Sequence, residues 1–151
     1  MNHRGTEEGA EGAEEEVKGS DADTDADARD VSHGVIGAAI EVHRVIGPGF
    51  LESIYEEALA VELELRGVPF RRQVPIAMDY KGRPIGQARL DLLVAGRLVV
   101  ELKAVEQLAP IHTAQLLAYL RATSLRHGLL ITFNVSALRL GIKRVIHAHD
   151  S

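Results

Sequence analysis

The feature that most constrains the fold is a pair of apolar segments, residues 83–94 and 97–105, joined by a short stretch that contains Gly96. A three-residue turn over residues 95–97 pairs apolar residues on one face: Val94 with Leu98, Leu92 with Val100, and Leu90 with Leu102. Because a slip of one residue would turn every side chain to the opposite face, this pattern predicts an antiparallel hairpin in that register.

The same register places charged residues on the other face of the hairpin. Asp91 is predicted to lie beside Glu101, with Cβ atoms about 5 Å apart, and Lys103 lies two residues further along. Two such carboxylates repel each other, and a divalent cation such as Mg²⁺, which binds carboxylate oxygens, removes the repulsion. Lys103 can then orient a water molecule or stabilise developing negative charge. The alternative is a partly buried structural triad in which Lys103 neutralises both carboxylates.

Hydrophobic periodicity predicts the remaining elements. We expect helices over residues 35–43, 51–66 and 111–126, a helical turn over 137–140, and strands over 69–80, 83–94, 97–105, 128–133 and 143–146. Short turns between the first three strands favour an antiparallel meander. The helix over 111–126 permits a crossover to a strand that runs parallel to an earlier one. The predicted fold class is therefore α/β (α+β), a layered domain with a mixed sheet.

Charge divides the chain into two parts. Residues 1–30 hold eleven acidic and three basic side chains, a net charge of −8, whereas the remaining residues carry a net charge of +3. Residues 1–32 have almost no large apolar side chains, which predicts a disordered acidic tail before a folded domain at 33–151. The tail either mimics nucleic acid and screens the basic domain, or is a solubilising extension.

Composition excludes several classes of protein. The chain has no cysteine, which rules out disulfides and thiolate metal sites, and no apolar run approaches the roughly 18 residues of a membrane span. We therefore expect a cytoplasmic protein that has no membrane association.

Two motifs carry a resemblance to a known family. Asp91, followed after nine residues by Glu101-Leu102-Lys103, resembles the core signature of the PD-(D/E)XK nuclease superfamily, with Leu90 in place of the proline. The stretch Gly49-Phe-Leu-Glu52-Ser-Ile-Tyr55 resembles the motif of the small GxxExxY proteins, a group within that superfamily. Further segments are similar to that group: Pro110-Ile-His112, residues 114–120, residues 128–134 and residues 141–144.

The resemblance implies a restriction-endonuclease-like αβββαβ core with a central mixed sheet flanked by helices. It also implies a site in which Asp91, Glu101 and Glu52 bind Mg²⁺ (or Mn²⁺) and Lys103 acts on the water, assisted by Gln115 of the crossover helix. From the residues alone, Glu52 is equally explained as a carboxylate favoured by the helix dipole in a first turn.

These observations support two hypotheses of different kinds. One is a metal-dependent endo- or exonuclease that hydrolyses phosphodiester bonds, with DNA as the expected substrate and RNA as the alternative. The other is a non-catalytic module that retains the nuclease fold and binds nucleic acid or protein. A homodimer or a targeting partner protein is compatible with both hypotheses.

Overall fold

The structure is a computed structural model, and it describes residues 21–148. Along the described chain the elements follow in this order: α2 (Asp21–Ile46), α3 (Glu52–Leu65), β1 (Phe70–Tyr80), β2 (Arg83–Val94), β3 (Leu98–Lys103), α4 (Pro110–Thr123), β4 (His127–Thr132), the 3-10 turn η1 (Leu138–Gly141) and β5 (Ile142–Ile146). The predicted elements are all present. Most of their ends differ from the prediction by a few residues, but α2 begins well before the predicted helix over residues 35–43. None of the helices in the described part is long and apolar enough to cross a membrane.

The five strands form one mixed sheet in the order β1-β2-β3-β4-β5. Strands β1, β2 and β3 are the predicted antiparallel meander, and α4 carries the chain across to β4, which pairs parallel with β3. Strand β5 then pairs antiparallel with β4. The predicted α+β class with a mixed sheet flanked by helices is therefore confirmed, and the arrangement is the restriction-endonuclease-like one.

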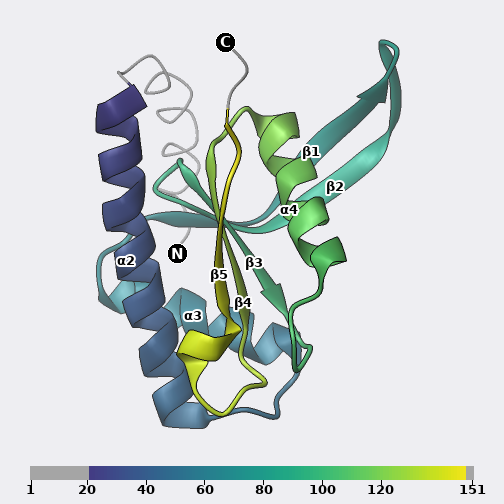
Figure 1. The fold of residues 1–151 in the computed structure, drawn as a ribbon. Coiled ribbons are helices and arrows are strands. Elements are labelled where there is room, and N and C mark those ends of the chain that lie inside the picture. Colours follow the sequence, from purple (N-terminus) through teal and green to yellow (C-terminus); the bar gives the residue numbers. More distant parts are fainter. Residues whose placement is uncertain (1–20, 149–151) are drawn as a thin grey trace.

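Helices cover both faces of the sheet (Figure 1), and each face has its own hydrophobic core. On one face, α2 and α3 pack on the sheet through fully buried residues such as Val35, Leu59 and Leu63. On the other face, Leu116 and Leu120 of α4 pack against the sheet. The two long strands β1 and β2 continue beyond both cores and project from the domain as a twisted hairpin (Figure 1).

The β2–β3 turn has the predicted three-residue form. Val94 is paired with Leu98, and Leu92 is paired with Val100. Ala95 and Gly96 take φ angles of 54° and 68°, the left-handed backbone that tight hairpin turns require. The alternation of apolar and charged residues thus selected the register as predicted.

The predicted pairing of Leu90 with Leu102 is wrong, and so is the single apolar face that it implied. The paired register ends at Leu92, and Leu90 packs in the α4 core whereas Leu102 packs in the opposite one. Gln73, on β1 between the pairs Arg72–Leu92 and Val74–Leu90, has a left-handed φ of 51° close to this point.

Helix α2 begins at Asp21, so residues 21–32, which we assigned to the disordered tail, are helical. This part of the prediction is wrong because contacts with distant segments stabilise an otherwise polar helix. Ala28 and Ser32 are buried, and Asp25 bonds to His127 at 2.8 Å. Asp27 pairs with Arg97 at 2.9 Å. The prediction for residues 1–20 lies outside the described residues.

Candidate active site

Asp91 and Glu101 are neighbours across β2 and β3, as predicted. The Asp91 N–H donates to Glu101 Oε2 at 2.9 Å, and the Leu102 N–H donates to Asp91 Oδ2 at 2.7 Å. Each carboxylate therefore accepts a backbone hydrogen bond from the opposite strand at the place where the regular ladder ends. The two side chains connect the strands and also bring their charges together.

Burial makes this carboxylate pair unusual. Glu101 is only 3% exposed, and burial, together with the charge of Asp91, raises the pKa of Glu101 to about 8. Burial likewise raises the pKa of Asp91, although the hydrogen bond from Leu102 opposes the change. Without a bound cation, Glu101 therefore holds a proton at neutral pH.

Lys103 lies on the same strand as Glu101 and is held from the other side by α4. Its Nζ atom donates to Gln115 Oε1 at 2.6 Å. Tyr119 lies one helical turn beyond Gln115, and burial together with the charges of Glu101 and Asp91 raises its pKa. Gln115 thus contacts Lys103 from the crossover helix.

Glu52 reaches the same region from α3, of which it is the first residue. Burial raises the pKa of Glu52, the charge of Asp91 raises it further, and Lys103 lowers it. Glu52 also raises the pKa of Glu101. Hydrogen bonds join Asp91 to Glu101 and Lys103 to Gln115, and Glu52 is near enough for its charge to act on Glu101.

The loop that precedes Glu52 is anchored by Tyr55. The Tyr55 hydroxyl donates to the Gly47 carbonyl at 2.6 Å and accepts from the Phe50 N–H at 3.1 Å. The Tyr55 ring stacks on Phe133 with ring centroids 4.4 Å apart. Tyr55 is therefore a buried residue that sets the start of α3, and hence the place of Glu52.

Sequence reasoning missed Glu56. It is buried, at 8% exposure, and accepts hydrogen bonds from Arg72 Nε at 3.0 Å and Gln73 Nε2 at 2.9 Å. Its charge raises the pKa of both Asp91 and Glu52. The sequence spacing could have indicated it, because Glu56 lies four residues after Glu52 and therefore on the same face of the helix.

His112 has a different role from its neighbours on α4. Its Nδ1 accepts a hydrogen bond from the Ala109 N–H at 2.9 Å, which satisfies a backbone donor at the start of the helix. His112 therefore stabilises the first turn of α4, whereas Gln115 contacts Lys103.

The donor chemistry of the site fits a hard divalent cation. Mg²⁺ is typically held by one or two carboxylates together with water molecules and substrate oxygens, and Asp91 and Glu101 supply two carboxylates. The buried Glu101 must lose its proton before it can bind a cation, because only an ionised carboxylate is a ligand. Within residues 21–148, however, no three His, Cys, Asp or Glu side chains are grouped to hold a metal, so Glu52 does not complete a preformed cage.

The chain matches the family model described as the PD-(D/E)XK nuclease superfamily over residues 29–145. It therefore belongs to that superfamily, whose nucleases generally use divalent metals such as Mg²⁺. The matched range includes every residue of the candidate site.

A comparison with solved structures agrees with this fold. The structure described as "Crystal structure of SSO0001" is similar with a TM-score of 0.50 and 19% sequence identity, over 65% of this chain and 50% of that one. The chain thus matches only half the length of that protein, and the likeness concerns the fold alone. No curated protein sequence matches the chain significantly.

Proposed function

We propose that this chain is a metal-dependent nuclease that hydrolyses phosphodiester bonds, with DNA as the proposed substrate and RNA as the alternative. One observation supports the proposal: a hydrogen bond joins Asp91 to Glu101 across β2 and β3, and Gln115 of α4 holds Lys103, two residues after Glu101. Membership of the nuclease superfamily supports the same chemistry. A homodimer or a targeting protein stays a prediction.

The carboxylates form the cation-binding part of the proposed site. Asp91 and Glu101 would hold Mg²⁺ or Mn²⁺, with Glu52 beside them. When bound, the cation supplies a Lewis acid that offsets negative charge on the phosphate oxygens. Its positive charge also favours the ionised form of Glu101, whose proton is otherwise retained.

Lys103 is the proposed catalytic residue. Its ammonium group has three donors, and Gln115 accepts from one of them at 2.6 Å. The remaining donors can orient the attacking water and stabilise the charge that develops on a phosphate oxygen. Hydrolysis adds the water oxygen to phosphorus, and the leaving oxygen departs with a proton. Gln115 acts as a positioning residue in this scheme.

We also assign the chain to the GxxExxY group within the superfamily. The three named positions of the motif have related tasks here. The Gly49 N–H donates to Asn134 Oδ1 at 2.8 Å, Glu52 faces the carboxylates, and Tyr55 holds the intervening loop. Gly49 and Tyr55 of the motif thus both help to fix the loop before α3, and this loop determines where the Glu52 carboxylate lies.

The test is cleavage of plasmid and oligonucleotide substrates with Mg²⁺, with Mn²⁺ and with a chelator. Wild-type protein should cleave only with metal, and Lys103→Ala and Asp91→Ala should lose at least about a hundredfold in rate. Lys143→Ala, which alters an exposed lysine, is the matched control. Equal activity in wild type and Lys103→Ala, with both proteins folded by circular dichroism, would refute the proposal.

A second candidate is the non-catalytic binding module. The observation that favours it is that the carboxylates of Asp91 and Glu101 each already accept a backbone hydrogen bond. It predicts saturable, salt-sensitive DNA binding without cleavage in either metal. In that case Glu101→Gln should change the stability of the fold, and there is no cleavage activity for it to affect.

A further inference from the structure

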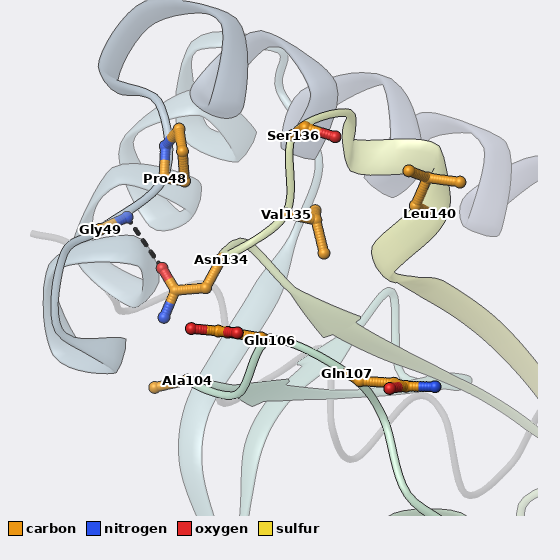
Figure 2. Close-up of a pocket in the computed structure, with 9 residues that line it drawn as sticks. All are labelled: Pro48, Gly49, Ala104, Glu106, Gln107, Asn134, Val135, Ser136 and Leu140. Carbon is orange, nitrogen blue, oxygen red and sulfur yellow. Dashed lines mark hydrogen bonds between the residues drawn. The ribbon is translucent and has the colours of Figure 1, made fainter.

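A pocket beside the site is formed by three loops that meet at one end of the sheet (Figure 2). It has a volume of about 750 Å³. Its walls come from the loop before α3, the loop after β3, and the segment that follows β4 and leads into η1. Its lining includes Pro48, Glu106, Gln107, Asn134 and Leu140.

The pocket adjoins the candidate site through the chain itself. Ala104, which lines the pocket, directly follows Lys103, and Gly49 lies three residues before Glu52. The pocket is therefore at the carboxyl ends of the parallel strands β3 and β4, where open α/β sheets generally bind ligands. If the phosphate of a nucleic-acid strand lies at Lys103, the neighbouring nucleotide can reach this pocket, because Ala104 of the lining is the next residue in the chain.

The lining of the pocket suits a nucleobase better than a phosphate. None of the residues that line it in the described chain is Lys or Arg, so a phosphate would find no opposite charge. Glu106 instead offers a carboxylate, and Gln107 and Asn134 offer amides. Pro48 and Leu140 provide apolar surface against which the flat face of a base can lie.

Asn134 gives the pocket an oriented donor. Its Oδ1 atom accepts from the Gly49 N–H at 2.8 Å, which fixes the amide so that its nitrogen is directed to the side of the pocket where Glu106 lies (Figure 2). The amide donor of Asn134 and the carboxylate acceptor of Glu106 thus lie near each other. This pairing complements the edge of a base that has both a ring acceptor and an exocyclic amino group, such as cytosine.

We propose that this pocket binds a nucleobase with an exocyclic amino group, in the nucleotide next to the scissile phosphate. The inference rests on the proposed nuclease function, because that function is what brings a strand to Lys103. Glu106 accepts a hydrogen bond from the amino group, and Asn134 donates to the ring acceptor. Thymine, which lacks the amino group, is disfavoured.

The test measures binding of fluorescent single strands of about twelve nucleotides, made of deoxycytidine, of thymidine, or of abasic residues. Fluorescence anisotropy is recorded with the Lys103→Ala protein and Mg²⁺, so that the strands stay intact. We expect the cytosine strand to bind about tenfold more tightly than the abasic strand, which corresponds to about 1.4 kcal/mol. The thymine strand should bind more weakly than the cytosine strand.

Two variants and two matched controls assign this effect to the pocket. In the same background, Glu106→Gln should remove the preference for cytosine over thymine. Leu140→Trp, which fills the pocket, should remove the advantage over the abasic strand. Glu64→Gln and Leu65→Trp change exposed residues of α3 outside the pocket lining, and both should keep the full preference.

Each outcome distinguishes the pocket from the nuclease activity. Wild-type cleavage together with equal binding of cytosine, thymine and abasic strands overturns the pocket assignment and leaves the proposed function standing. Absence of both cleavage and strand binding overturns both. Competition by free cytidine monophosphate, without any base preference in the strands, also overturns the proposal, because the pocket would then take a free nucleotide.

Discussion

The Asp91 N–H donates to the Glu101 carboxylate at 2.9 Å, so the two acidic residues of the site are joined through the backbone of one and the side chain of the other. The Asp91 carboxylate in turn accepts from the Leu102 N–H. These bonds hold β2 and β3 together where their regular pairing ends. Substitution of either residue therefore changes strand pairing as well as charge.

The first prediction concerns stability and pH without metal. Folding raises the pKa of Glu101 from 4.5 to about 8, so between these values the folded chain binds a proton that the unfolded chain has released. The free energy of unfolding should therefore fall as pH rises from about 4.5 to 8 because of this residue. Urea unfolding of wild type and Glu101→Gln in a chelator should show a flatter profile for the variant. Glu64→Gln should keep the wild-type slope, and identical slopes in all three proteins would contradict the prediction.

The second prediction concerns added metal. A cation that binds only the folded chain stabilises it by mass action, and binding requires ionised carboxylates. Mg²⁺ should therefore raise the melting temperature more at pH 8 than at pH 5.5. Differential scanning calorimetry checks this, with Asp91→Ala as the variant that should lose the shift. A shift of the same size in Asp91→Ala would place the cation elsewhere.

The third prediction concerns the positioning role of Gln115. Gln115→Ala removes the acceptor that holds Lys103 Nζ, and misplacement of a catalytic group costs about ten- to a hundredfold in rate. We expect kcat to fall by that factor with little change in KM, in steady-state cleavage of an oligonucleotide. Gln87→Ala, at an exposed position of β2, is the control and should match wild type. A fall in both variants would point to a general loss of folded protein.

The fourth prediction concerns the anchor of the α3 loop. Tyr55→Phe leaves the Gly47 carbonyl and the Phe50 N–H without their shared partner, and the loss should cost about 1–3 kcal/mol of unfolding free energy. Tyr80→Phe removes a hydroxyl from a residue that is 61% exposed and should have little effect. Chemical denaturation measures both variants. Equal stability of Tyr55→Phe and wild type would show that the hydroxyl does not hold the loop.

The fifth prediction concerns the start of α2. Ala28 is 1% exposed, so Ala28→Asp buries a charge that has no partner and should cost about 2–4 kcal/mol. Ala26→Asp makes the same change two residues away at an exposed position. Thermal unfolding of the two variants therefore tests whether residues 21–32 belong to the domain. Similar melting temperatures for the two variants would show that residues 21–32 are not packed as part of the folded domain.

The sequence alone was sufficient for the elements and for the β2–β3 turn. Alternation with period two and helical periodicity depend only on residues that are close in the chain, and the apolar side chains permit one register. That register predicts that Asp91 lies beside Glu101, and the hydrogen bond between them confirms it. The same local reasoning failed at Leu90, because its packing against α4 depends on segments that are distant in the chain.

Tertiary structure decided the properties that depend on distant segments. Burial between two layers raises the pKa of Glu101, and the amide that holds Lys103 comes from α4, the crossover helix that follows β3. Asp25 lies in helix α2, where Arg126 and His127 from a distant segment lie beside it. Local composition determines which side chains can be buried or charged, whereas desolvation and Coulomb energies depend on which partners the fold brings near.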